Sequence, residues 1–389
     1  MTVNEMREKF DEKYGAGDDV VTVFAPGRVN LIGEHIDYNG GYVFPCALSF
    51  GTYIMARRRN DKQLNLASMN LALTVSAQLD EIKYSEENDW ANYPLGVVYE
   101  FIKSGLAPRL RGMDLLFYGD VPRGSGLSSS ASLEVAMATL VNHMFGLDID
   151  MVELVKKAQR AENTFVGVSC GIMDQFASGM GKKDHALMLR CSDLEYQYAP
   201  LNLGGMKIII ANTNKKRGLV DSKYNERRAE CDAAFNDLKG SVLPNIDYLC
   251  DIEPKMFEGV TQFIKSTVAA KRARHAVYEN QRVIDAFEKL KNNDIDGFGA
   301  LMVQSHESLR DLYEVTGEEL DVLFEEAMKV DGCVGSRMTG AGFGGCTVSI
   351  VKDEAVEGFI EKVGKNYTKR TGNVADFYVA EIGRGAYIV

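Results

Sequence analysis

Strand-like and helix-like segments follow one another in blocks along this chain, and that order restricts the folds open to it. Strict alternation of strands and helices, which a doubly wound sheet requires, is not seen, so the pattern predicts an α+β fold. The predicted strands are residues 20–24, 52–58, 63–68, 71–77, 113–119, 185–191, 196–201, 206–213, 344–351 and 375–382. The predicted helices are residues 1–15, 93–105, 131–146, 151–165 and 354–367, together with a helix-rich stretch over 219–329.

The length of 389 residues allows two or three domains of roughly 150 residues each. The predicted boundary lies at Gly204 and Gly205, between two predicted strands. It divides the chain into an N-terminal domain of residues 1–204 and a C-terminal domain of residues 205–389, with the last strand able to return to the first domain.

The balance of charge limits the partners that we expect. Lys and Arg number 44 against 55 Asp and Glu, which gives a net charge of −11. Such a surface repels the phosphate backbone of nucleic acids and anionic membranes, so we expect neither as a partner. Anionic ligands must then be held by local arrangements of donors and cations.

Cysteine usage and the absence of apolar segments indicate a cytoplasmic protein. The seven cysteines are scattered and include no CxxC pair, which argues against a disulfide framework and against a zinc cluster. The first fifteen residues are mixed in charge and have helical periodicity, unlike a signal peptide. No apolar run reaches the roughly 18 residues of a membrane span.

Three glycine-rich segments carry the candidate chemistry, and the first of them is GRVNLIGEHIDYNGG, residues 27–41. It places four ionisable side chains beside a permissive backbone: Arg28, Glu34, His35 and Asp37. A structural salt bridge is an alternative role for Arg28, but an arginine between two glycines of an acid-rich segment favours ligand binding.

The second segment, VPRGSGLSSSASLEVA over residues 121–136, leads from a strand into three serines at a helix start. Backbone N–H groups, hydroxyls and a helix N-terminus together form a cradle for phosphate. Taken alone, the segment fits an ordinary capped loop at least as well. The sequence has no GxxxxGK[ST], no GxGxxG after a strand with an acidic partner, and no HRD or DFG set, which excludes the usual P-loop, the Rossmann cofactor site and the protein-kinase fold.

The third segment, GSRMTGAGFGGC from Gly335, has five glycines within eleven residues. Close approach of backbone to a ligand and tight packing of a helix hairpin on a sheet explain it equally well. Two acidic residues between these segments, Glu162 and Asp174, are further candidates. Asp174 has apolar neighbours in the sequence, although either carboxylate alone could be a solvated surface charge.

The order of GRVNLIGEHIDYNGG, VPRGSGLSSSASLEVA, CGIMDQFAS and TGAGFGGC resembles the galactokinase family, a branch of the GHMP kinases. The resemblance covers nearly the whole chain, and the first motif is the most specific. It implies a ribosomal S5 domain 2-like N-terminal domain, a ferredoxin-like C-terminal domain and a site between them. It also implies transfer of the γ-phosphoryl group of ATP to the anomeric hydroxyl of α-D-galactose, which gives galactose 1-phosphate and ADP.

The same resemblance assigns roles to individual residues, with Arg28 and Asp174 as the catalytic pair. Whether Asp174 is a general base or an orienting carboxylate stays open. Sugar contacts are implied for Glu34, His35, Ile36, Asp37, Gly171 and Tyr224. ATP contacts are implied for Ser68, Gly124, Ser125, Gly126, Leu127, Ser128, Ser129 and Ser130. Mg²⁺ is implied beside Ser130 and Glu162, and the loop of residues 340–345 is implied to support both the phosphate loop and the sugar site.

Two alternatives stay open at this stage. One is a related GHMP kinase for N-acetylgalactosamine or another sugar, and the other is a non-catalytic sensor of galactose and ATP. The uninterrupted GLSSSAS and the presence of Asp174 favour an enzyme. We expect a monomer whose partners are the small molecules galactose and ATP.

Overall fold

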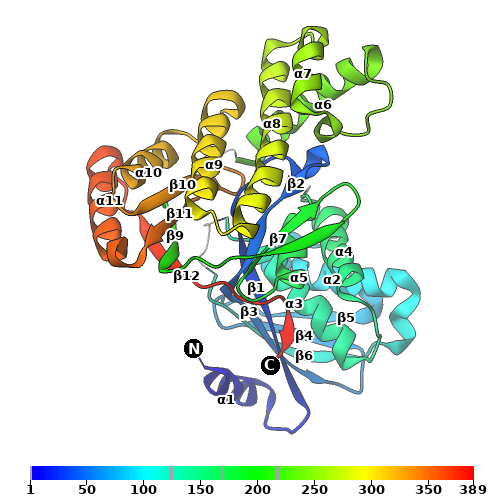
Figure 1. Cartoon of the computed structure of the whole chain (residues 1–389). Helices are drawn as coiled ribbons and strands as arrows, with labels where there is room; N and C mark the ends of the chain where they lie inside the picture. Colours follow the sequence, from blue (N-terminus) through cyan, green and yellow to red (C-terminus); the bar gives the residue numbers. More distant parts are fainter. Residues whose placement is uncertain (1, 122–125, 169, 216–219) are drawn as a thin grey trace.

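The computed structural model describes residues 2–121, 126–168, 170–215 and 220–389. It is an α+β structure built around three sheets (Figure 1). The largest sheet has six strands in the order β13-β1-β3-β6-β4-β5, of which only β4 and β6 pair in parallel. Its strands are β1 (Val20–Asn30), β3 (Pro45–Arg58), β4 (Gln63–Ser68), β5 (Val75–Gln78), β6 (Met113–Gly119) and β13 (Tyr387–Ile388).

Helices cover both faces of this sheet, because apolar side chains alternate between its faces along each strand. On β3, Ile54 and Ala56 point into the core under the helices that follow β5, whereas Met55 points to the opposite face. There Met6 and Phe10 of α1 (Val3–Tyr14) cover it. The helices on the first face are α2 (Asn92–Phe101), α3 (Ser129–Met144), α4 (Met151–Arg160) and α5 (Met173–Met180).

The second sheet has four antiparallel strands in the order β10-β11-β9-β12. Strands β11 and β12 flank β9 and are joined by α11. These elements form a split β-α-β unit. Helices α9, α10 and α11 pack against this sheet. The bounds are β9 (Met206–Asn212), β10 (Cys333–Thr339), β11 (Cys346–Lys352), β12 (Asp376–Ala380), α9 (Ile295–Ser308), α10 (Glu318–Met328) and α11 (Val356–Thr371).

A small sheet and a helical projection complete the molecule. The strands β2 (Tyr42–Val43), β7 (His185–Arg190) and β8 (Tyr196–Pro200) form the sheet. The helices α6 (Val220–Ser241), α7 (Pro254–Val260) and α8 (Thr267–Lys291) project away from the sheets at the top of Figure 1. One hydrophobic core joins residues of β1, β9, α5, α8 and α9, so packed side chains connect the two larger sheets.

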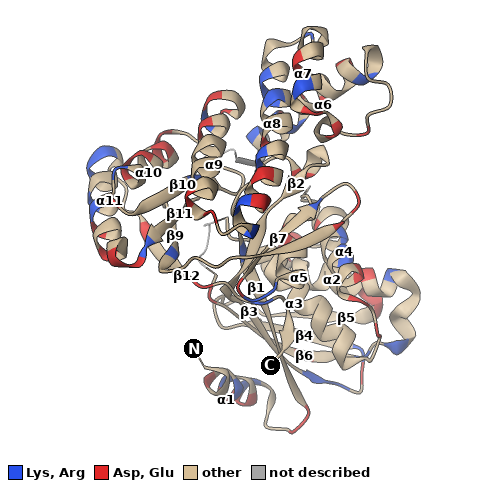
Figure 2. Ribbon diagram, viewed as in Figure 1, with Lys and Arg blue, Asp and Glu red and all other residues tan. Residues whose placement is uncertain are grey.

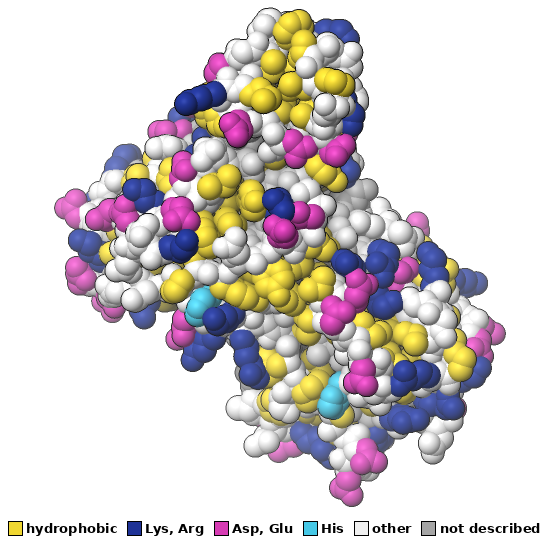
Figure 3. Space-filling view, turned by 45° about the vertical axis from the view of Figure 1, so that its right-hand side comes forward, with side chains coloured by type: hydrophobic (Ala, Val, Ile, Leu, Met, Phe, Trp, Pro, Cys, Tyr) yellow, Lys and Arg dark blue, Asp and Glu magenta, His cyan; other side chains and the backbone are white. Residues whose placement is uncertain are grey.

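Charged side chains of both signs are interspersed along the outer helices, and the central strands carry few of them (Figure 2). The face in Figure 3 likewise shows both signs among hydrophobic side chains. Within the ranges that the structure describes, no helix is both long enough and apolar enough to cross a bilayer.

The α+β fold predicted from the sequence is confirmed, but β1 (Val20–Asn30) and β3 (Pro45–Arg58) are longer than the strands predicted at 20–24 and 52–58, and further local features differ as follows. The strand predicted at 71–77 is only β5, Val75–Gln78. Half of the third glycine-rich segment forms a strand of its own, β10, so the glycines at 340–345 connect two neighbouring strands. The helix predicted over 151–165 changes at Ala161 into a π-helical turn, Ala161–Val166.

Candidate active site

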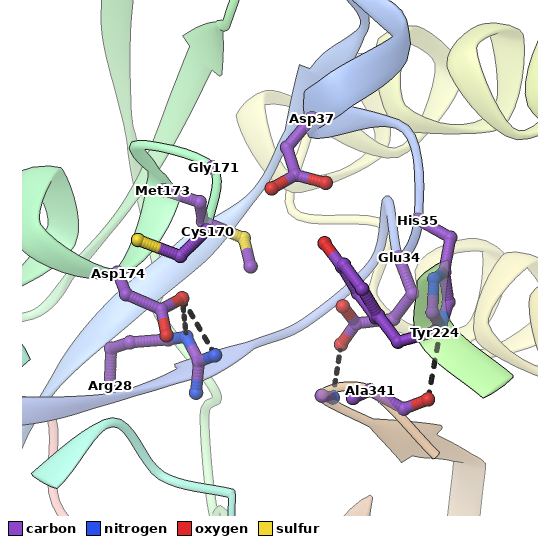
Figure 4. Close-up of a pocket in the computed structure, with 11 residues that line it drawn as sticks. Arg28, Glu34, His35, Asp37, Cys170, Gly171, Met173, Asp174, Tyr224 and Ala341 are labelled. Atoms are coloured by element: carbon purple, nitrogen blue, oxygen red, sulfur yellow. Dashed lines mark hydrogen bonds and ion pairs between the residues drawn. The ribbon is translucent and has the colours of Figure 1, made fainter. Parts of the chain in front are cut away.

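A cavity between the two larger sheets brings together residues from four separate segments (Figure 4). All of the residues with predicted catalytic or sugar-binding roles line it except Ile36, whose side chain is buried in the hydrophobic core. The lining consists of Arg28, Glu34, His35, Asp37, Cys170, Gly171, Met173, Asp174, Tyr224, Gly340 and Ala341.

At one side of the cavity, Arg28 and Asp174 form an ion pair. Nε and Nη2 of Arg28 lie 2.9 and 2.7 Å from the same oxygen, Oδ1 of Asp174, and Nη1 donates to the carbonyl oxygen of Gly126 at 2.7 Å. Arg28 follows an irregularity in the pairing of β1 with β3, and Asp174 stands in the first turn of α5, where a helix N-terminus favours negative charge. The pair is therefore fixed before any ligand arrives.

The end of the phosphate loop is attached to this ion pair. The hydroxyl of Ser128 donates to Oδ2 of Asp174 at 2.5 Å, and the backbone N–H of Arg28 donates to the carbonyl of Leu127 at 3.2 Å. A Cβ atom at Gly27 would lie 2.8 Å from that carbonyl oxygen, which explains the glycine. Ser128, predicted to bind ATP, thus contacts the carboxylate of Asp174. Two other predicted ATP contacts, Gly124 and Ser125, lie outside the described residues.

On the opposite side of the cavity, His35 is a neutral side chain, and both of its ring nitrogens form hydrogen bonds. Burial, and the neighbouring His275 and arginine charges, lower the pKa of His35 to about 3. Its Nε2 lies 3.1 Å from the carbonyl oxygen of Ala341, which can only accept, so we assign the proton to Nε2. Nδ1 then accepts from the hydroxyl of Tyr38 at 2.9 Å. His35 therefore ties the first glycine-rich segment to the loop between β10 and β11.

Asp37 fits against Gly171, and the fit requires a glycine. A Cβ atom at position 171 would lie 1.9 Å from Oδ2 of Asp37, so any other residue would displace the carboxylate. Burial, followed by the nearby charges of Asp174 and Glu34, raises the pKa of Asp37 to about 6. The aromatic ring of Tyr224 on α6 packs beside this side of the cavity, 5.6 Å from the ring of His35.

A second cavity lies beside the start of α3 and suits a nucleotide. It includes Ser68, Ser129 and Ser130, three of the predicted ATP contacts. Sequence reasoning missed its other walls, which include four aromatic side chains from two distant segments. The sequence feature that could have indicated this cavity was the single tryptophan, Trp90, which follows Asn88 and Asp89. The full lining is Thr52, Ser68, Asn70, Leu71, Asp89, Trp90, Tyr93, Phe117, Tyr118, Gly119, Val121, Ser129, Ser130 and Leu133.

Glu162 lies behind Ser130 on the π-helical turn. Its carboxylate accepts from the hydroxyl of Ser130, from Nε2 of Gln175 at 2.6 Å and from the thiol of Cys170 at 3.3 Å. Burial and the charge of Asp174 raise its pKa. Gln175 also donates to Glu134 at 3.0 Å, and this fully buried carboxyl was missed by sequence reasoning. Among the described residues, no group of three or more His, Cys, Asp or Glu side chains forms a metal cluster.

Known proteins resemble this chain over its whole length. Residues 8–58 match the galactokinase galactose-binding signature, residues 92–182 the N-terminal domain of GHMP kinases and residues 286–369 their C-terminal domain. The galactokinase of Clostridium tetani is 51% identical over 388 residues, which is 100% of this chain and 98% of that protein. The chain belongs to the galactokinase family. The galactokinase of Bacillus subtilis, 53% identical over 98% of both chains, agrees.

Solved structures of the family confirm the two-domain GHMP kinase fold. Lactococcus lactis galactokinase, solved with galactose, superposes with a TM-score of 0.95 at 42% identity over 100% of both chains. The mevalonate kinase of Methanococcus jannaschii has a TM-score of 0.67 at 19% identity, over 95% of this chain and 100% of that one. At this identity the comparison shows a common fold and no more. The activity is that of an ATP-dependent sugar kinase, which favours the enzyme over the sensor left open by the sequence.

Proposed function

We propose that galactose binds in the cavity of Figure 4 with its anomeric hydroxyl at the Arg28–Asp174 pair. The observation that supports this proposal is that the cavity has its positive charge at one side and two carboxylates at the other. Among the described residues, Arg28 is the arginine of the lining, and it is bonded to Asp174 and to the end of the phosphate loop. Asp37 and Glu34 face the cavity from the other side. Carboxylates that accept hydrogen bonds from hydroxyls are suited to a neutral sugar.

ATP then occupies the neighbouring cavity, with its phosphates at the start of α3. The backbone N–H groups there and the hydroxyls of Ser129 and Ser130 can hold phosphate oxygens, and the aromatic walls can hold the base. Because Ser128 bonds Asp174, the phosphate end of this cavity adjoins the sugar cavity. The γ-phosphoryl group would lie between the two.

Phosphoryl transfer in this site depends on positioning and on neutralising charge. Arg28 places a positive charge beside the transferred group, and Asp174 accepts the proton of the anomeric hydroxyl as the new O–P bond forms. The bond between the γ-phosphorus and the β–γ bridging oxygen breaks in the same step, and ADP leaves. Asp37 and Glu34 orient the sugar so that this hydroxyl is in line with the phosphate. The general-base role of Asp174 is a proposal, since the same geometry serves an orienting carboxylate.

The residues beside the phosphate site fit Mg²⁺. Ser130 and Glu162 offer hydroxyl and carboxylate oxygens side by side, and a magnesium site completed by ATP phosphates and water needs only one or two protein oxygens. Ser130 and Glu162 would hold the ion there, and it would offset negative charge on the ATP phosphates.

We also propose that the enzyme acts as a monomer in the cytoplasm and binds neither nucleic acid nor membranes. Two observations support the proposal. All seven cysteines are free, as in a reducing compartment. Charges of both signs are mixed on the faces in Figures 2 and 3, without a continuous basic surface there.

Galactose affinity is expected to fall as the pH is lowered through about 6. Asp37, with its pKa raised to about 6, is mainly ionised at neutral pH and accepts hydroxyl hydrogen bonds. Protonation removes that acceptor, so the Kd for galactose should rise about tenfold by roughly one pH unit below the pKa. His35, with a pKa of about 3, stays neutral over this range. Calorimetric titrations of galactose from about pH 8 to about pH 5 measure the change.

The matched variant is Asp37→Asn, which keeps the shape against Gly171 but has no proton to gain. It should bind galactose weakly at every pH, with a flat profile over the same range. A flat profile for the unmodified enzyme would show that Asp37 does not change its protonation over this range, and an unchanged slope in the variant would show that another group causes the pH dependence. An unchanged Kd in the variant at neutral pH would show that Asp37 does not contact the sugar.

A further inference from the structure

Arg337, on strand β10, is a fully buried cation just behind the sugar cavity. Its Nη1 donates to the backbone carbonyl of Asn30 at 3.0 Å and lies 3.5 Å from Oε1 of Glu34, and its Nε donates to Ser305 at 3.2 Å. Arg337 is 0% exposed, and its Nη2 has no hydrogen-bonding partner among the described residues. A buried guanidinium is costly unless carboxylates balance it, so Glu34 and Arg337 depend on each other.

Among the described residues, the carboxylate of Glu34 receives its hydrogen bonds from the end of β10. Besides Arg337, Oε1 of Glu34 accepts from the backbone N–H of Gly340 at 2.7 Å and from the hydroxyl of Thr339 at 3.0 Å. None of the residues that the structure describes donates to Oε2. The hydrogen bonds to Oε1 thus fix the carboxylate, which faces the cavity (Figure 4).

A second carboxylate completes the support behind Arg337. Glu279 on α8 accepts from Ser305 at 2.5 Å, from the backbone N–H of Gly33 at 3.0 Å and from Arg282 at 2.7 Å. Burial alone would raise the pKa of Glu279, but Arg282, His275 and Arg337 hold it at about 2. The charges alternate in sign, from Arg282 and Glu279 on α8 to Arg337 on β10 and then to Glu34.

From this arrangement we propose that Arg337 and Thr339 are positioning residues for sugar recognition. They come from the second sheet and fix the rotamer of Glu34, so that Oε2 is aimed at a sugar hydroxyl. Neither residue lines the cavity. The inference rests on the proposed contact between Glu34 and galactose, and it makes sugar affinity depend on a strand that does not touch the sugar.

The test compares two conservative variants, Thr339→Val and Arg337→Lys, by calorimetric titration of galactose and of an ATP analogue. Each is expected to raise the Kd for galactose by about tenfold or more, because each removes a hydrogen bond to a charged group. The Kd for the ATP analogue should stay unchanged. The control is Arg272→Lys, another buried arginine, which lines neither cavity and should alter neither Kd. If Arg337→Lys does not fold, Thr339→Val decides alone.

A double variant separates this inference from the proposal on which it rests. If Thr339 acts through Glu34, Glu34→Gln combined with Thr339→Val should bind galactose no more weakly than Glu34→Gln alone. Additive losses, unchanged galactose affinity in Thr339→Val, or an equal loss of galactose and ATP affinity would each overturn the inference. Unchanged galactose affinity in Glu34→Gln would instead overturn the proposed sugar contact, and the inference with it.

Discussion

Replacing Asp174 by Asn is expected to lower turnover by at least about a hundredfold, the low end for a positioned proton acceptor. The amide keeps the shape of the side chain, and its oxygen can still accept from Arg28, which lies 2.9 Å from Oδ1. Its NH2 group, in the place of Oδ2, can donate to the hydroxyl oxygen of Ser128. It can no longer take a proton or balance the guanidinium. Steady-state ADP release at saturating galactose and ATP measures the loss, and calorimetry should show both ligands still bound.

The matched control is Asp114→Asn. Asp114 is also a buried aspartate paired with an arginine, 2.9 Å from Arg59, but it lies on β6 and lines neither cavity. This variant should lose stability and keep its turnover. Near-normal turnover in a folded Asp174→Asn variant would remove Asp174 from the chemistry, whether as base or as orienting group.

Glu162→Gln is expected to raise the Mg²⁺ concentration needed for half-maximal turnover by at least about tenfold. Mutation of a residue that contacts only a metal ligand typically lowers metal affinity by about 10 to 100-fold. Glu162 is proposed to contact the ion itself. Galactose affinity should stay unchanged, since Glu162 lies outside the sugar cavity. Titration of Mn²⁺ into the enzyme with an ATP analogue, followed by electron paramagnetic resonance, reports metal binding without turnover.

Glu100→Gln is the control for that variant. Glu100 is a buried glutamate on α2, paired with Arg160 at 3.2 Å, and it lines neither cavity. It should leave the Mg²⁺ dependence as it is. Weaker galactose binding with a normal Mg²⁺ dependence in Glu162→Gln would place Glu162 away from the metal.

The class of fold could be predicted because strand and helix periodicity is a local signal. The β10 strand was missed because its run, Cys333 to Thr339, is short and lies next to a dense group of glycines. The π-helical turn at Ala161 has the same apolar spacing as the helix before it, so no local signal separates them. The division at residues 204 and 205 stays a prediction.

The candidate site was predictable where one short motif supplies several side chains, as in residues 27–41. Contacts between distant segments were not predictable in this way. Arg337 and Glu34 are 303 positions apart, and nothing in the spacing of either residue indicates the other. Trp90 and the other aromatic walls of the nucleotide cavity were missed for the same reason, since periodicity assigns such residues to the core.

The most direct measurement is phosphorus NMR of the product formed from galactose, ATP and Mg²⁺, recorded with proton coupling to locate the ester. A galactose whose anomeric hydroxyl lies at the Arg28–Asp174 pair should give one new phosphate ester, coupled to the proton on C1, in an amount equal to the ADP released. An ester on any other carbon, or ADP released without a sugar ester, would contradict that placement of the sugar.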